Sequence, residues 1–186
     1  MTDDPIALFA AAAVQASRLV NGVTADRLAD PTPCEQWDVR ALVNHLVTGN
    51  LLFASLVEGG ERPDRAADHL GDDHVAAFRD SVHRVSRAFA AGDVLSGTFP
   101  TPFGPAPGVK LVMMRFNELV VHGWDLAAAT ARADTLDPHL ADVSLAEFET
   151  APVLPRGEGA PFGLALPPPP DAGPIERLAA FLGRKS

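Results

Sequence analysis

The chain has 186 residues, of which 47% are hydrophobic and 21% charged, a composition typical of a folded domain with a full-sized core. Its net charge of −9 and its two lysines, Lys110 and Lys185, argue against nucleic acid or an anionic membrane as a partner, because both need a basic face. The single cysteine, Cys34, excludes an internal disulfide. With an acidic N-terminus and no apolar run of membrane-spanning length, these features predict a cytoplasmic protein.

Apolar residues recur every three or four positions along four long segments, which predicts an all-α fold. Aspartates suited to cap a helix stand at the start of three of these segments. The capping candidates are Asp3 or Asp4 before Pro5, then Asp38, then Asp72 or Asp73. The long helices are predicted over residues 4–21, 38–57, 73–91 and 109–131, and a shorter one from Asp137-Pro138 to Glu149.

Glycine and proline mark two irregular stretches. The loop over residues 94–108 could hold a short strand at Val94–Phe99, and a loop in this place often shapes a pocket. In the tail, Phe162–Leu166 could form a short strand. We expect Asp171 to cap a last helix over residues 173–182, with Gly183 ending it and Arg184 facing the negative end of its dipole. The sequence thus predicts one domain over residues 1–186, with a bundle core over 1–150 and a Pro-rich tail over 151–186.

The segment over residues 115–130 places a carboxylate on a helix that is apolar on most sides. Glu118 and His122 are four residues apart, so they share one face of that helix. A buried carboxylate is costly unless a basic side chain, protonation or a metal ion compensates its charge. We favour a metal ion, with His45 on the helix over residues 38–57 as the third ligand.

Two histidines and one carboxylate form a ligand set that suits zinc, and also nickel or iron(II). Three protein ligands leave an open position, which is typical of a catalytic zinc site. Asp125, one turn beyond His122, is a candidate to orient a ligand histidine or to act as a general base. Weaker candidates for supporting the site are Arg115, Asn44 and Asn117.

Other interpretations of these residues stay open. Glu118 could instead form a salt bridge to Arg115 or Arg40, and a lone histidine such as His45 is more often a hydrogen-bonded core residue than a ligand. Trp37 is interpreted as an anchor that packs the preceding loop onto the core beside the site. Cys34 could be an activated thiol near a helix N-terminus, but it lies in no motif that supports this role. The other histidines are expected on polar faces: His69, His74, His83 and His139.

Three stretches of the chain are distinctive: WDVRALVNHL from Trp37, ELVVHGWDLA from Glu118, and RLAAFLGR from Arg177, the last preceded by Asp171-Ala172. Together they resemble an actinobacterial family of the DinB/YfiT-like superfamily, which is related to the metal-binding domain of mycothiol-dependent maleylpyruvate isomerase. The resemblance implies an up-down four-helix bundle with a metal held between two helices. Its ligands would be His45, Glu118 and His122.

The resemblance also implies a chemistry. The open metal position would take the thiolate of mycothiol, which could add to a small electrophile and give isomerisation or S-transfer. The isomerase carries an extra C-terminal domain that the short tail here does not match, so maleylpyruvate itself is not the expected substrate. The rival classes are a metal-dependent hydrolase that uses bound water and a protein that binds a metal or ligand without catalysis. The oligomeric state, including a homodimer, stays open.

Overall fold

The computed structural model describes residues 4–34, 37–101, 104–151, 155–157, 160 and 162–184. These residues form six α-helices and one two-stranded sheet, so the predicted all-α fold is confirmed. The predicted helix ends agree with the observed ones to within one residue. The helices are α1 (Pro5–Asn21), α2 (Val39–Glu58), α3 (His74–Ala90), α4 (Gly108–Thr130), α5 (Pro138–Thr150) and α6 (Pro174–Phe181).

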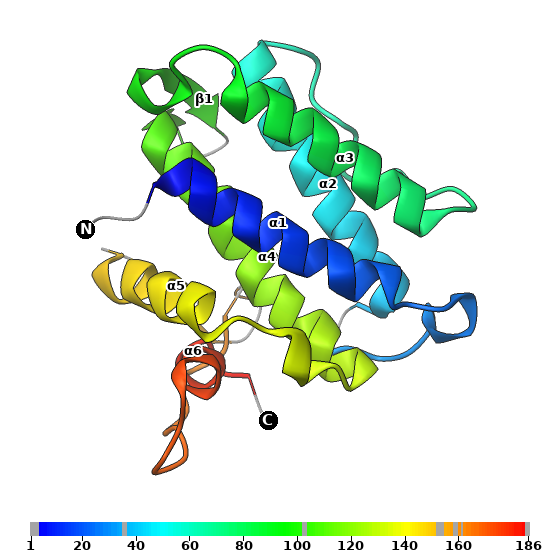
Figure 1. Cartoon of the computed structure of the whole chain (residues 1–186), viewed down its shortest axis with the longest axis vertical. Helices are drawn as coiled ribbons and strands as arrows, with labels where there is room; N and C mark the ends of the chain where they lie inside the picture. The colour runs from blue at the N-terminus through cyan, green and yellow to red at the C-terminus, as the bar shows by residue number, and fades with distance from the viewer. Residues whose placement is uncertain are drawn as a thin grey trace.

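Helices α1 to α4 form the bundle, and α5 and α6 lie together against one side of it (Figure 1). Helix α1 packs on α4 and α3, while α2 packs on α3 and α4. Phe9 of α1 meets Phe89 of α3 edge to face, with ring centroids 4.9 Å apart. Leucines from α1, α2 and α4 fill the middle of the core, and each is fully buried: Leu19, Leu42, Leu46, Leu111, Leu119 and Leu126.

Aspartate side chains begin four of the helices, as the sequence predicts for three of them. Asp4 accepts a hydrogen bond from Ile6 N (3.1 Å), and Asp38 accepts one from Ala41 N (2.8 Å). Asp73 and Asp137 cap α3 and α5 in the same way. Each cap satisfies a backbone N–H that the helix itself cannot, which stabilises the protein by roughly 1 kcal/mol. Asp3, the other candidate for α1, lies outside the described residues.

The loop before α4 differs in part from its prediction. Val94–Ser96 is a 3-10 turn, so the strand expected there begins only at Thr98. Strand β1 (Thr98–Thr101) pairs in antiparallel register with β2 (Gly104–Pro107), which the sequence does not predict because its prolines and glycine disfavour a strand. This hairpin packs on α4 and α2 at one end of the bundle.

Two predictions for the tail are wrong. Of the strand expected over Phe162–Leu166, only Phe162 pairs, in an isolated bridge with Arg156. The N-cap of α6 is Gly173, not Asp171, and it makes no side-chain capping bond. Gly183 does end α6, in the left-handed conformation that a glycine adopts without strain (φ +75°).

One helix in the described part of the chain, α2, has the length and mean hydropathy (1.2) of a membrane-spanning segment. More than half of that apolar window, 56%, is buried inside the bundle. The central helix of a bundle passes the same test of length and composition, so this feature is weak support for a membrane span.

We expect Gly108→Ala to destabilise the protein by about 2 kcal/mol or more, because the new methyl group would overlap the backbone oxygen of Val94. Gly108 also donates its N–H to Gly97 O (2.8 Å), which fixes the close approach of the hairpin to the start of α4. Urea unfolding measures the loss. Gly60→Ala is the control, since nothing lies within 4 Å of a Cβ there. Equal stability of the two variants would contradict the account of this junction.

Candidate metal site

The side chains of His45, Glu118 and His122 converge between α2 and α4. His45 Nε2 lies 2.9 Å from Glu118 Oε2, and His122 Nε2 lies 3.7 Å from the same oxygen. The four-residue spacing on α4 puts Glu118 and His122 on the face that meets α2. One ligand atom from each residue lies within 4.8 Å of the other two, within reach of a single divalent ion.

This cluster lies at the edge of the bundle and not in its centre. The side chain of Glu118 is 40% exposed and that of His45 is 27% exposed, whereas that of His122 is 11% exposed. Solvent therefore reaches the cluster from the Glu118 side, while the His122 side is enclosed by protein. A small molecule could approach the ligand atoms from that open side.

The electrostatics of the cluster favour an ionised carboxylate at Glu118 and a neutral imidazole at His45, the forms that bind metal. Burial would raise the pKa of Glu118, but the hydrogen bond from His45 and the neighbouring His122 and Arg115 side chains lower it to about 2. Burial is the main cause that lowers the pKa of His45.

Arg115 places a buried positive charge on α4, one turn before Glu118 in the sequence. Its side chain is fully buried, and burial lowers its pKa to about 10. Its guanidinium donates to Asn50 Oδ1 (2.8 Å) and to Leu46 O (2.9 Å), so it holds α4 to α2. Gly49 makes the room, because a Cβ at that position would overlap the guanidinium. The salt bridge to Arg40 considered from the sequence does not form, since Arg40 pairs with Asp68 (2.6 Å).

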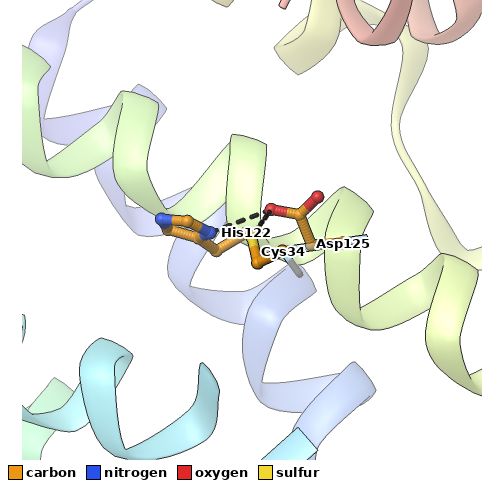
Figure 2. A group of neighbouring side chains, drawn as sticks. All are labelled: Cys34, His122 and Asp125. Atoms are coloured by element: carbon orange, nitrogen blue, oxygen red, sulfur yellow. Dashed lines mark hydrogen bonds and ion pairs between the residues drawn. The ribbon is translucent and has the colours of Figure 1, made fainter. Parts of the chain in front are cut away.

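Asp125 fixes the orientation of the His122 ring. Its Oδ2 lies 2.9 Å from His122 Nδ1 (Figure 2). Burial would raise the pKa of Asp125, but the hydrogen bonds from His122 and Arg184 lower it, so the carboxylate is ionised and only accepts. The proton of the His122 ring is therefore assigned to Nδ1, which leaves the lone pair of Nε2 free to face Glu118 and His45.

Two further residues bind Asp125, and both come from segments far away in the sequence. Cys34, in the segment before α2, donates its Sγ–H to Asp125 Oδ2 (3.2 Å), and Figure 2 shows it beside the carboxylate. Arg184, in the tail, donates Nε to Oδ1 and Nη2 to Oδ2, both at 3.1 Å. One possible ligand atom each of Cys34, His122 and Asp125 also lies within 4.8 Å of the other two. The Arg184 guanidinium already supplies a positive charge beside this second group, so it does not need a metal ion.

The remaining residues singled out from the sequence take different places. The ring of Trp37 lies against that of His45, with centroids 4.5 Å apart, and forms a wall of the cluster. Asn44 faces away from the site and binds the connection to α3, through Ala67 O and His69 N. Asn117 Oδ1 is buried and has no hydrogen-bond partner in the described part of the chain.

The donor set fits a divalent ion. It offers two imidazole nitrogens and one carboxylate oxygen, the set that suits zinc, nickel or iron(II). His122 donates Nδ1–H to a carboxylate, and most metal-binding histidines make such a hydrogen bond with the ring nitrogen that does not bind the metal. Metal binding itself stays a prediction.

Sequence reasoning missed the part played by Arg184 and did not place Cys34. Arg184 was expected at the negative end of the α6 dipole, but its side chain reaches Asp125 of α4 instead. One signal was present: a carboxylate on an apolar helix needs a cationic or hydrogen-bonding partner. That signal says that a partner exists, but it does not say which of the chain's 15 lysines and arginines provides it.

Comparison with known proteins agrees with this architecture. A sequence model of the mycothiol maleylpyruvate isomerase N-terminal domain matches residues 9–127. Two uncharacterized proteins of Mycobacterium tuberculosis, from strains CDC 1551 and H37Rv, are each 38% identical to this chain over 187 residues, covering 97% of it and 98% of their own length.

Two solved structures share the fold. The crystal structure of the mycothiol-dependent maleylpyruvate isomerase aligns with a TM-score of 0.54 and 20% identity, and a histidine-to-alanine mutant of it aligns with 0.54 and 19%. Each alignment covers 66% of this chain but only 59% of the isomerase chain. The chain belongs to the mycothiol maleylpyruvate isomerase N-terminal domain family, and it spans under two thirds of the isomerase whose structure it matches.

We expect Cys34 to react far more slowly with alkylating reagents than an ordinary thiol. Burial and the neighbouring Asp125 carboxylate raise the pKa of Cys34 from 9.0 to about 12. At pH 8 its thiolate fraction is therefore on the order of a thousandfold below that of an unperturbed cysteine. Because thiolate keeps forming up to about pH 12, the rate of iodoacetamide labelling should rise tenfold per pH unit from pH 7 to 10.

The urea-unfolded protein is the control for this measurement, since its cysteine should level off near pH 9. A plateau at or below pH 9 in the folded protein would contradict the raised pKa. Steric shielding of the thiol alone would lower the labelling rate at every pH but would leave the plateau of the rate beginning near pH 9. The pH profile therefore separates a raised pKa from shielding.

Proposed function

From the family to which the chain belongs, we propose that this protein is a divalent-metal enzyme that uses a low-molecular-weight thiol, mycothiol, in isomerisation or S-transfer on a small electrophile. The observation that carries the proposal is the convergence of His45, Glu118 and His122 between α2 and α4. The ligands would be these three side chains, with zinc the best match and nickel or iron(II) also suited.

The ion would supply one thing to the reaction: it lowers the pKa of a bound thiol so that the thiol is deprotonated near neutral pH. The chain itself supplies the geometry. Asp125 keeps the Nδ1 proton of His122, and the ionised Glu118 provides the negative charge that the ion balances. The exposed side of Glu118 leaves an approach for the thiol and the electrophile.

The surroundings of the cluster would exclude part of the water and position an apolar group. The indole of Trp37 lies against the ring of His45 and 5.6 Å from that of His122, so it forms an apolar wall over both imidazoles. A substrate bound beside the two imidazoles would lie near this wall, and an indole face suits an unsaturated, planar electrophile.

The rival hydrolase needs a general base near the bound water, and Asp125 is the candidate from the sequence. In the structure Asp125 has no exposed surface, and both of its oxygens accept hydrogen bonds from protein donors. A carboxylate in that position suits the orientation of His122 better than proton transfer to or from a substrate. The geometry therefore favours the thiol-dependent proposal over hydrolysis.

We expect one divalent ion per purified wild-type chain, and its loss in His45→Ala and His122→Ala. Each substitution removes one of three ligands, so affinity for zinc should fall by more than about a hundredfold. Elemental analysis after dialysis measures the metal content. His83→Ala is the matched control, because His83 lies exposed on α3, away from the cluster. The same trace metal in wild type and both ligand variants would refute the site.

We expect turnover of a small α,β-unsaturated electrophile only when mycothiol is present, with loss of activity in His122→Ala and retention in His83→Ala. The reason is that the nucleophile is the thiol, whose deprotonation depends on the metal ligands. Consumption of the electrophile is followed by absorbance with and without the thiol.

The same assay separates the rival classes. Equal rates with and without mycothiol, both dependent on metal, would refute thiol transfer and indicate a hydrolase. Absence of any turnover together with unfolding on chelation would refute the enzyme proposal and indicate a metal that only stabilises the bundle.

A further inference from the structure

We propose that Arg184, in the tail, is a positioning residue for the metal site. It acts through Asp125: by holding both carboxylate oxygens, it fixes the carboxylate that orients His122. The proposal deepens the function proposed above, on which its metal-binding part rests, and its structural part can be tested in metal-free protein.

Arg184 holds the Asp125 carboxylate at both of its oxygens. Its Nε and Nη2 each lie 3.1 Å from a different oxygen, so the guanidinium makes a two-point contact. The side chain of Arg184 is only 9% exposed and that of Asp125 is fully buried. A two-point contact sheltered from water fixes the plane of the carboxylate as well as its charge.

Without Arg184, the two oxygens of the Asp125 carboxylate would keep different numbers of donors. Oδ2 would keep two donors, His122 Nδ1 and Cys34 Sγ. Oδ1 would have none among the described residues, because its one partner there is Arg184 Nε. A fully buried oxygen without a donor is costly, so the carboxylate would turn to share its remaining donors. The hydrogen bond that sets the His122 ring would then no longer be fixed.

The backbone at the end of α6 directs Arg184 toward Asp125 of α4. At the end of α6, Gly183 N donates to Ala180 O (3.0 Å) and Arg184 N donates to Ala179 O (2.9 Å), the pair of bonds of a Schellman motif. Gly183 is left-handed, and a Cβ there would lie 2.6 Å from the Cα of Gly163. The left-handed Gly183 reverses the chain after α6, and its backbone passes close to that of Gly163. The direction of Arg184 is thus built into the end of α6.

An alternative role for Arg184 is only to anchor the tail on the bundle. The tail has a matched anchor that touches no site residue: Arg177 of α6 pairs with Asp142 of α5 (2.8 Å), on the surface. Arg177→Gln is therefore the control for loss of tail anchoring, and Arg184→Gln tests the contact to Asp125. Arg184→Lys keeps the charge but cannot make the two-point contact.

The first readout is the ring of His122 in metal-free protein, by long-range ¹H–¹⁵N correlation of the imidazole nitrogens. We expect wild type and Arg177→Gln to hold the proton on Nδ1 and Arg184→Gln to show a mixture of the two tautomers. Arg184→Lys should lie between them and also serves where the glutamine variant does not fold. An unchanged His122 tautomer in a folded Arg184 variant would overturn the proposal, whatever the metal result.

The second readout is affinity for Zn²⁺, measured in competition with a chromophoric chelator. Loss of an outer partner of a ligand histidine weakens binding by about 10- to 100-fold, and we expect Arg184→Gln to fall in that range while Arg177→Gln stays within about twofold. Because both act on one contact, Arg184→Gln combined with Asp125→Asn should be no weaker than Asp125→Asn alone. Additive losses would overturn the proposal. If wild type binds no Zn²⁺, the function proposed above fails, and the tautomer readout alone decides the role of Arg184.

Discussion

The buried charges of α4 constrain the rest of the molecule. This helix carries Arg115, Glu118 and Asp125 within eleven residues, and two of them, Arg115 and Asp125, have no exposed surface. A charge taken out of water must find a partner inside the protein, or its cost exceeds the few kcal/mol by which a domain is stable. Arg115 and Asp125 therefore determine what must pack beside them.

The partners come from segments that the chain must bring together to satisfy those charges. Helix α2 provides Asn50 and a backbone carbonyl for Arg115, and His45 for Glu118. The segment before α2 and the end of the tail provide Cys34 and Arg184 for Asp125. The candidate metal site is thus part of a row of polar side chains that lies between α2 and α4 and ends at Arg184 in the tail.

Local patterns explain why so much of the fold could be predicted from the sequence. Helix ends depend on neighbouring residues, such as a capping aspartate or a terminal glycine, so Asp4, Asp38 and Gly183 mark them directly. The approach of His45 to Glu118 and His122 was expected from helix faces and from family resemblance. The hairpin before α4 was missed because Pro105 and Pro107 contradict strand propensity, and its pairing with β1 is set by tertiary packing.

The contact between Arg184 and Asp125 shows where prediction from one sequence stops. The two residues are 59 positions apart, and no periodicity links a helix face to a residue beyond the end of another helix. The family match also ends at residue 127, so it includes Cys34, Asp125 and all three candidate ligands but not Arg184. The candidate ligands thus lie within the part that the family model matches, whereas Arg184 lies in the tail beyond it. Since α4 presents a buried carboxylate at Asp125, a cation beside it offsets the cost of burying that charge, and the turn at Gly183 brings Arg184 to that position.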